Sequence, residues 1–376
     1  MVAGPALRVT IDATPLLGRR TGVGAFVAGA LPLLAADDSL EFSAYALSLR
    51  GGRRLPRHLP AGVRPLRRPM PAGALIAAWC RADGPPGRWW WGGATPDVVH
   101  GTNFVTPPST PAAEVVTVHD LTPLRHPEWA APATRPFPAV LRRALARGAL
   151  VHTPSRFVAA EVCDAFGLRA DRVTAVHHGV PSAVPATAAP PVPGRYVLAL
   201  GTVEPRKGLP ALVHAFDGLA AADPELQLVV AGPPGWGQEA LDEAVARAHH
   251  RDRVVRLGWV APGVATALLR GAAVLAYPSL DEGFGFPPLQ AMAAGVPVVA
   301  SRAGALPEVL GDGAHLVATA DTDALAEGLA LVLGDDQERA ALVGRGHRQA
   351  ASYSWASCAA GLADLYRAAA AQSRTA

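Results

Sequence analysis

Two neighbouring cations at the end of an apolar run are the residues of this sequence whose chemistry is easiest to name. Lys207 is the only lysine among 34 lysines and arginines, and it stands directly after Arg206. Both follow the apolar run 196–200 and the turn Gly201–Thr202. A lysine offers a compact point charge and an arginine a planar fork of donors, so the pair suits the oxygens of a diphosphate. An exposed loop lysine is the alternative, since most lysines lie at the surface.

A loop that contains two glycines follows another apolar run. The run 273–277 precedes Glu282 and then Gly283, Phe284 and Gly285, after which two prolines mark the start of a helix. Free backbone amides at a helix start bind anions or hydroxyls, and glycine lets a ligand approach the backbone closely. We therefore expect a second binding element here, with an ordinary turn that carries an exposed glutamate as the alternative.

The first half of the chain contains weaker candidates. His119 ends the apolar run 114–119, where a parallel strand would reach a binding edge, although a lone histidine in such a segment is more often structural. Gly22 and Gly24 form only a fragment of the Gly-x-Gly-x-x-Gly pattern, and no acidic residue at the next strand end supports a dinucleotide site. We interpret these two glycines as a tight turn.

Short apolar runs alternate with alanine-rich helical segments, and this order occurs twice, as a parallel α/β sheet requires. In the first half we expect strands at 7–13, 41–47, 97–101, 114–119, 150–153 and 173–177, and helices at 24–35, 138–147 and 155–166, the last capped by Ser155. In the second half we expect strands at 196–200, 226–231, 253–257, 273–277, 296–301 and 315–317, and helices at 210–221, 238–248, 264–269, 287–294, 322–333, 337–349 and 354–370.

A proline-rich segment separates the two halves. Residues 181–194 contain five prolines in fourteen residues, which suits a stiff linker better than a helix or strand. The sequence predicts a Rossmann-like domain at 1–185, a second at 194–350, and a last helix at 351–376 that returns to the first domain. The expected fold class is α/β, with two facing doubly wound domains and a cleft between them, because such sheets bind ligands at the carboxyl ends of their strands.

The motifs together resemble a known family over nearly the whole chain. The segments 201–207 and 282–290 are similar to the retaining nucleotide-sugar glycosyltransferases of family 4, which have the GT-B fold. The glycine turn 21–24, the histidine segment 118–128 and residues 353–355 match further parts of the family pattern. The most similar subgroup includes many mannosyltransferases of bacterial envelope and polysaccharide assembly.

The resemblance implies a role for each candidate residue. Arg206 and Lys207 would hold the donor diphosphate beside Gly201 and Thr202, and Glu282 would contact the transferred sugar, helped by the backbone of Gly283, Phe284 and Gly285. His119 would lie near the donor sugar and acceptor, and Gly22 and Gly24 near the diphosphate or acceptor. The family places a second glutamate eight positions after the first, on the ribose, where this chain has Gln290. An uncharged amide accepts such bonds less well, so we expect donor binding weaker by about 1 kcal/mol.

The expected activity is that of a retaining hexosyltransferase, of class EC 2.4.1, that moves mannose from a nucleoside-diphosphate sugar to a glycan, lipid-linked or small-molecule acceptor. A nucleotide-sugar epimerase and a non-catalytic subunit with the same fold are the alternatives. No cofactor and no metal are expected, because no acidic metal-binding pair stands near the donor loop and a cation pair can stabilise the leaving diphosphate.

Composition excludes several classes of protein. The net charge is only +3 and the 12 histidines are scattered, so we do not expect nucleic-acid binding. The three cysteines are far apart and lack ligand spacing, and we find no signal peptide and no apolar run long enough to cross a membrane. These features predict a cytoplasmic protein.

One basic segment leaves two interpretations open. Seven arginines lie between Arg50 and Arg68, and Trp79 and 89–91 follow. Basic charge and indole rings suit a peripheral contact with the inner membrane face. A solvated, arginine-rich loop with buried tryptophans is the alternative.

Overall fold

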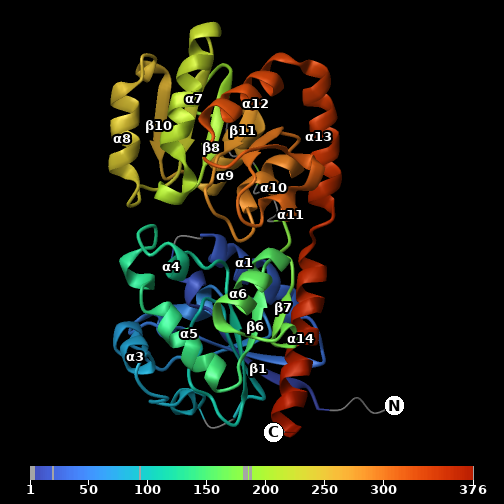
Figure 1. Ribbon diagram of the computed structural model, residues 1–376. Coiled ribbons are helices and arrows are strands. Elements are labelled where there is room, and N and C mark those ends of the chain that lie inside the picture. Colours follow the sequence, from blue (N-terminus) through green and yellow to red (C-terminus); the bar gives the residue numbers. More distant parts are fainter. Residues whose placement is uncertain (1–4, 19–20, 93–94, 181–184, 186–188, 376) are drawn as a thin grey trace. The chain divides into compact units, whose positions relative to one another are not determined.

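The computed structural model describes residues 5–18, 21–92, 95–180, 185 and 189–375, and it divides into two compact units (Figure 1). Unit 1 comprises Met1–Gly179 and Ser354–Ala376, and unit 2 comprises Val180–Tyr353. The chain therefore passes between the units twice, at 179–180 and at 353–354. Of the linker predicted at 181–194, residues 181–184 and 186–188 lie outside the described residues.

Unit 1 contains a parallel seven-stranded sheet in the order β3-β2-β1-β4-β5-β6-β7. Its strands are β1 (Leu7–Asp12), β2 (Leu40–Tyr45), β3 (Val63–Pro65), β4 (Val98–Gly101), β5 (Ala113–Thr117), β6 (Leu150–Thr153) and β7 (Val173–Ala175). Its helices are α1 (Gly22–Leu34), α2 (Gly51–Arg54), α3 (Ala72–Trp79), α4 (Thr122–Arg125), α5 (Phe137–Ala146), α6 (Arg156–Phe166) and α14 (Trp355–Thr375). Ser155 caps α6 as predicted, because its Oγ accepts a bond from the Val158 amide at 3.2 Å.

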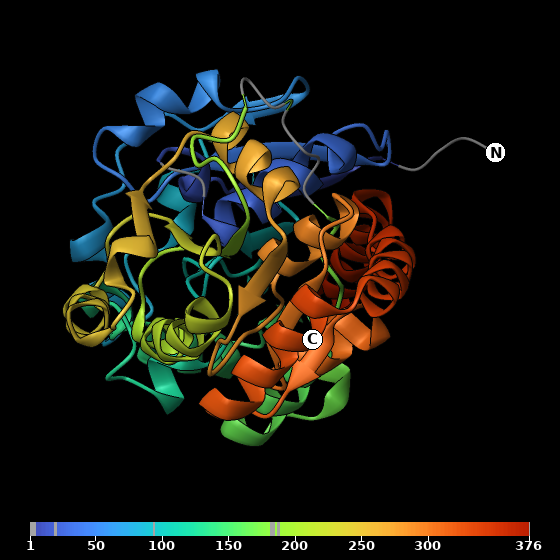
Figure 2. The same ribbon diagram turned by 90° about the horizontal axis from the view of Figure 1, so that it is seen from above.

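Unit 2 contains a parallel six-stranded sheet in the order β10-β9-β8-β11-β12-β13, with helices on both faces (Figure 2). Its strands are β8 (Tyr196–Leu200), β9 (Gln227–Ala231), β10 (Val254–Gly258), β11 (Val274–Tyr277), β12 (Val298–Ser301) and β13 (His315–Val317). Its helices are α7 (Leu209–Ala222), α8 (Gln238–Arg247), α9 (Pro262–Gly271), α10 (Phe286–Ala293), α11 (Leu306–Leu310), α12 (Thr322–Gly334) and α13 (Asp336–Ala351). The predicted α/β class with two doubly wound domains is confirmed.

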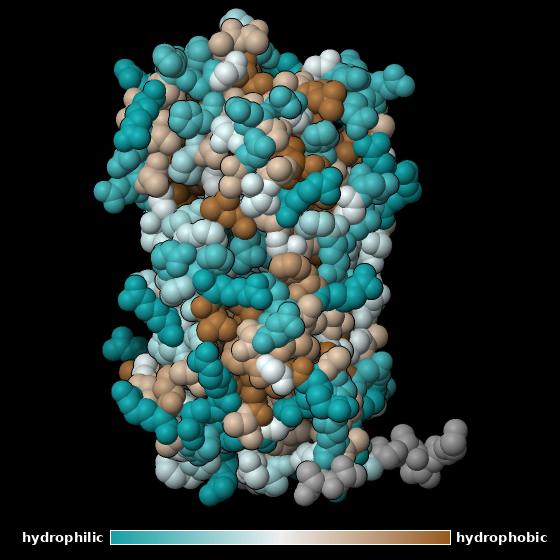
Figure 3. Space-filling view, in the orientation of Figure 1, coloured by the Kyte–Doolittle hydropathy of each residue, from teal (hydrophilic) through white to brown (hydrophobic). Residues whose placement is uncertain are grey.

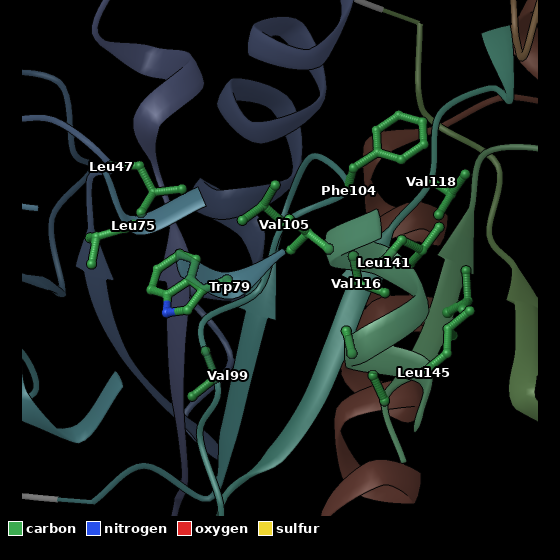
Figure 4. Packing of buried hydrophobic residues seen from close by; sticks show 14 of the residues in the cluster. Leu47, Leu75, Trp79, Val99, Phe104, Val105, Val116, Val118, Leu141 and Leu145 are labelled. Atoms are coloured by element: carbon green, nitrogen blue, oxygen red, sulfur yellow. The ribbon is translucent and has the colours of Figure 1, made fainter. Parts of the chain in front are cut away.

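The cores of both units consist of strands that are buried on both faces. Val115 and Val116 of β5 are fully buried, as are Leu198 and Val197 of β8. In unit 1, side chains from α3 and α5 point into the cluster around the strands (Figure 4). Hydrophilic side chains cover most of the face shown in Figure 3, and the hydrophobic ones lie in small separate areas.

Helix α14 is fixed to unit 1 by a tryptophan that fills the space above two glycines. A Cβ atom on Gly29 of α1 would lie 2.2 Å from the Trp355 ring, and one on Gly179 would lie 2.4 Å from the Trp355 amide nitrogen. Side chains at either glycine would therefore displace Trp355, at the residue where α14 begins.

A chain of buried hydrogen bonds holds the same helix further along. His152 Nε2 lies 3.1 Å from the Val176 carbonyl oxygen, so this nitrogen carries the proton and Nδ1 accepts from Thr117 Oγ1 at 2.9 Å. Thr117 in turn accepts from His100 Nε2 at 2.7 Å, and His100 Nδ1 accepts from Tyr366 Oη at 2.8 Å. Burial lowers the pKa of both histidines, to about 3 for His152, so both rings are neutral and every donor has an acceptor.

Candidate active site

The cation pair lies in the loop that follows β8, and this loop packs against the loop that follows β11. Residues Pro205–Lys207 form a single 3-10 turn, and Gly208 then adopts a left-handed conformation with φ of +63° before α7 starts. A Cβ atom on Gly208 would lie 2.2 Å from the Pro278 carbonyl oxygen, so only glycine lets the two loops approach this closely. The Leu280 amide also donates to the Arg206 carbonyl oxygen at 2.6 Å.

Glu282 stands at the centre of the site. Its Oε1 lies 2.9 Å from Arg206 Nη1 and forms an ion pair with Lys207 Nζ. The same oxygen accepts hydrogen bonds from Tyr277 Oη at 2.8 Å and from Ser279 Oγ at 3.0 Å. The structure thus brings three of the four predicted catalytic residues, Arg206, Lys207 and Glu282, into direct contact.

Lys207 is held from two sides. Its Nζ donates to Tyr277 Oη at 2.8 Å and lies 4.8 Å from the centre of the Tyr277 ring, a cation–π distance. Tyr277 therefore accepts from the lysine and donates to Glu282, and its position sets the distance between the two charges. This side chain ends β11, which is buried along its whole length.

The electrostatics keep Glu282 ionised. Burial alone would raise the pKa of this carboxyl, but Arg206, Lys207 and their hydrogen bonds outweigh burial and lower the pKa to about 2. Burial and the neighbouring Arg206 lower the pKa of Lys207, although Glu282 opposes that shift. The site is thus an ionic cluster in which two partly buried cations share the buried Glu282 carboxylate.

Sequence reasoning missed Glu204, Tyr277 and Ser279. Glu204 Oε2 accepts from Arg206 Nε at 2.8 Å, so this guanidinium is fixed between Glu204 on one side and Glu282 on the other. With Lys207, the cluster contains two cations and two carboxylates. Their positions in the sequence could have indicated them, because Tyr277 is the last residue of β11, and Glu204 and Ser279 lie in the loops that follow β8 and β11.

The cluster lies where the strand order of the sheet reverses. Strand β8 is flanked by β9 and β11, and a pocket at this point is lined by residues that include Gly201, Thr202, Lys207, Tyr277 and Pro278. Ligands of doubly wound sheets bind at such a switch point, outside the carboxyl ends of the strands. The predicted donor-binding residues Gly201 and Thr202 therefore share one pocket with the lysine.

The glycine loop contributes backbone rather than side chain. Phe284 is buried, and its ring packs against the rings of Phe286 at 5.3 Å and Tyr353 at 5.6 Å. Gly285 has a φ of +101° and precedes α10, which carries the half-buried Gln290. The Phe284 side chain is buried, so the donor role predicted for this residue would have to use its backbone.

The remaining predicted residues lie in unit 1. His119 follows β5, and its Nε2 donates to the Thr102 carbonyl oxygen at 2.9 Å; burial is the main cause of its lowered pKa. Gly22 and Gly24 lie in the first turn of α1, which begins two residues earlier than predicted. Phe26 of that helix contacts His119 edge-on at 5.6 Å, so the helix and the histidine belong to one cluster.

Gly304 packs against the backbone of Glu282. Replacing Gly304 therefore tests how closely the loop that carries Glu282 must pack. Gly304 has a φ of +54°, and a Cβ atom there would lie 2.3 Å from the Glu282 carbonyl oxygen and 2.7 Å from its amide nitrogen. We expect Gly304→Ala to lower the free energy of unfolding by about 2 kcal/mol, from backbone strain plus displacement of the loop. Chemical denaturation of both proteins measures this.

The control for that substitution is Gly218→Ala. Gly218 is an exposed helical glycine of α7 with nothing within 4 Å of its added Cβ, so alanine should leave stability equal or raise it by up to about 1 kcal/mol. Equal stability of the two variants would show that the Glu282 loop tolerates displacement.

The described residues contain neither a candidate metal site nor a membrane-spanning helix. Within those ranges, no group of three or more histidine, cysteine, aspartate or glutamate residues is placed to hold a metal ion. No helix in the same part of the chain has the length and apolar character needed to cross a membrane.

Comparisons with known proteins concern the family and the fold of the chain. The family model described as "Glycosyltransferase Family 4" matches residues 33–184, and the model described as "Glycosyl transferases group 1" matches residues 186–349. The O-antigen chain mannosyltransferase B of Escherichia coli is 32% identical over 283 residues, which are 72% of this chain and 74% of that protein. The MMP alpha-(1->4)-mannosyltransferase of Mycolicibacterium hassiacum is 39% identical over 198 residues, 50% of this chain and 47% of that protein. The chain thus spans about half the length of several other relatives that it matches.

Solved structures share the fold at low sequence identity. Sucrose-phosphate synthase from Thermosynechococcus elongatus has a TM-score of 0.72 at 18% identity, covering 96% of this chain and 98% of that one. The HepE protein of Anabaena, solved in complex with UDP-glucose, has a TM-score of 0.69 at 18% identity, covering 96% and 100%. From these matches, the chain belongs to the family 4 glycosyltransferases and has the GT-B fold.

Proposed function

We propose that this glycosyltransferase moves a mannosyl residue from a nucleoside-diphosphate sugar to a glycan, lipid-linked or small-molecule acceptor, with retention of the anomeric configuration. The observation that carries the proposal is the contact of Arg206 and Lys207 with Glu282 at the switch point of the unit 2 sheet. Mannosyltransferases among the relatives support the choice of sugar. The HepE complex with UDP-glucose supports a nucleotide-sugar donor.

In this proposal the two cations stabilise the charge that develops on the leaving diphosphate. A guanidinium and an ammonium that are already fixed by Glu204, Tyr277 and Glu282 need little reorganisation when that charge appears. Preorganised donors in a site of low polarity are the largest source of stabilisation in many enzymes. No metal ion is needed for this step, so we propose metal-independent transfer without a cofactor.

The proposed task of Glu282 is to position the sugar. Its Oε1 contacts Tyr277, Ser279 and Arg206, and these contacts fix the orientation of the carboxylate. We propose that the second carboxylate oxygen accepts hydroxyls of the transferred hexose, beside the amides of Phe284 and Gly285. Holding the sugar in one orientation removes much of the entropic barrier to transfer.

A panel of GDP-, UDP- and ADP-sugars tests the proposal by thermal shift and by product analysis. A donor that binds only the folded protein raises the melting temperature, and transfer releases the nucleoside diphosphate when an acceptor is present. An isomerised donor formed without acceptor would instead establish an epimerase. A protein that binds no nucleotide sugar would contradict the transferase proposal.

Gln290 provides a prediction about affinity. We expect Gln290→Glu to tighten donor binding by about 1 kcal/mol, roughly fivefold, because a carboxylate accepts ribose hydroxyls more strongly than an amide does. Isothermal titration with the preferred donor measures the change. Gln337→Glu, on the exposed first turn of α13, is the matched control. Unchanged affinity in Gln290→Glu would remove this residue from the donor site.

His119 provides a prediction about turnover. We expect His119→Ala to lower kcat/KM by about 100-fold, the usual contribution of one positioned polar group at a reacting centre. Circular dichroism should show that the fold persists, because the His119 ring makes a single hydrogen bond to the residues that the structure describes, to the Thr102 carbonyl oxygen. His126→Ala, at a partly exposed ring stacked on Trp129, is the control. Near-normal turnover in His119→Ala would leave the histidine with a structural role only.

A further inference from the structure

The charge of this protein is unevenly distributed along its sequence. The first 179 residues contain 20 arginines and 12 acidic residues, a net charge of +8, whereas the remainder contains 14 basic and 19 acidic residues, a net charge of −5. The segment 42–82 alone contains eight arginines and no acidic residue. Outside it, the first 179 residues are balanced, with 12 arginines and 12 acidic residues. A general preference for arginine does not explain an excess that lies in one segment.

The arginines of this segment are exposed, and they form no ion pair with any carboxylate that the structure describes. Arg50, Arg53, Arg54, Arg67, Arg68 and the nearby Arg88 are all exposed. Among the described residues, no carboxylate lies within ion-pair distance of any of the six. Other arginines of unit 1 do form such pairs, for example Arg147 with Glu114 at 2.7 Å.

Backbone contacts bring these arginines onto one surface of unit 1. The Met70 amide donates to the Ser48 carbonyl oxygen at 3.1 Å, which joins the segments that leave β3 and β2. A Cβ atom on Gly52 of α2 would lie 3.0 Å from the Arg67 carbonyl oxygen, so α2 lies against the Arg67 backbone. We call the six arginines listed above the arginine surface.

Two apolar side chains stand among these charges. The Arg68 guanidinium bonds to the Trp89 carbonyl oxygen, and Trp90 Nε1 donates to the Pro69 carbonyl oxygen at 2.8 Å. Trp89 is 58% exposed and Leu49, which precedes Arg50, is 64% exposed, whereas Trp79 and Trp91 are buried. Of the two sequence interpretations, buried tryptophans therefore account for Trp79 and Trp91 but not for Trp89.

We propose that the arginine surface, with Leu49 and Trp89, docks unit 1 on a lipid bilayer that contains anionic headgroups. Guanidinium groups bind lipid phosphates through two parallel hydrogen bonds, and an indole ring and a leucine side chain enter the boundary between headgroups and acyl chains. A nucleic acid would use the charges but would give Leu49 no apolar contact. The proposal goes beyond the proposed function, because docking needs no donor, and it would bring a lipid-linked acceptor within reach.

Vesicle flotation tests this with the full chain. Wild-type protein is expected to float with vesicles of phosphatidylcholine plus phosphatidylglycerol and to remain unbound with phosphatidylcholine alone, with binding that weakens as salt increases. R53A/R54A/R67A should weaken binding about 100-fold, roughly fivefold for each arginine near an anionic surface. The matched control is R251A/R270A/R348A, which removes three exposed arginines of unit 2 and should bind like the wild type. W89A should retain electrostatic attraction but detach at lower salt than the wild type.

Three outcomes would overturn the proposal: equal wild-type binding to neutral and anionic vesicles, equal binding by the triple variant and its control, or binding of the wild type to a duplex oligonucleotide but not to vesicles. The dependence of vesicle binding on lipid composition and salt is measured on the wild-type protein. The proposal can therefore be tested even if a variant fails to fold. A donor thermal shift on the same preparations separates the two proposals. Protein that binds a nucleotide sugar but no vesicle contradicts docking alone.

Discussion

Replacing Glu282 by glutamine is expected to lower kcat/KM by about 100- to 1000-fold, the effect of removing one preorganised polar group from a reacting centre. It is also expected to lower the free energy of unfolding by about 3 kcal/mol at neutral pH, because Arg206 and Lys207, whose side chains are only 17% and 12% exposed, would lose the carboxylate that pairs with both. Steady-state kinetics and urea denaturation measure the two effects separately.

The pH dependence of that stability difference follows from the carboxyl's pKa. Folding lowers the pKa of Glu282 from 4.5 to about 2, so its contribution to stability is complete above the unfolded value and is lost as pH falls from about 4.5 through about 2. A shift of this size corresponds to about 3 kcal/mol. The difference between wild type and Glu282→Gln should therefore shrink over this range.

An exposed glutamate serves as the control for Glu282→Gln. Glu128 has a side chain that is 61% exposed, and Glu128→Gln should change neither turnover nor the acid limb of the stability curve. A stability difference for Glu282→Gln that stays constant from pH 5 to pH 2 would contradict the electrostatic account of the cluster. Turnover within a few-fold of the wild type would contradict the placement of Glu282 in the active site.

The sequence was sufficient to locate strands that are buried on both faces. Strand β8 begins and ends as predicted, because Tyr196 to Leu200 are consecutive apolar residues bounded by a charged residue and a glycine. Strand β3 was missed because it is an edge strand of three residues that contains Arg64 and ends in Pro65, which shows neither an apolar run nor alternation. Helix α3 was missed because the arginine-rich loop before it and the run of small apolar residues give no clear helical period.

The sequence predicted which residues of the site lie near one another, but not which side chains they contact. The residues at 206, 207 and 282 follow neighbouring strands of one sheet, so strand order alone brings them to one edge. Their partners follow from packing that no spacing reveals: Tyr277 bridges Lys207 and Glu282, which are 75 residues apart in sequence. Phe284 likewise matched a donor-loop pattern, but whether its ring faces a ligand or the core depends on Tyr353, far along the chain.

Replacing Lys207 is expected to have the largest effect on chemistry. Lys207→Met keeps an unbranched side chain but removes the ammonium group that contacts Tyr277 and Glu282. We therefore expect kcat/KM to fall by about 1000-fold. Lys207→Arg should restore little of this loss, because a planar fork does not fit a point-charge position beside the Tyr277 ring. Arg348→Met, at an exposed arginine of α13, is the control for removal of a cation.

Because Lys207 is the only lysine, a chemical label can test its place in the site directly. Pyridoxal phosphate condenses with the unprotonated form of an amine, and burial lowers the pKa of Lys207 from its ordinary value. After borohydride reduction, mass spectrometry should find the label on Lys207 and on the amino terminus, and a nucleoside diphosphate should protect only Lys207. If the nucleotide protects neither amine while still raising the melting temperature, the diphosphate binds away from Lys207, and the loss of activity in Lys207→Met would have to arise from the broken ion pair with Glu282 alone.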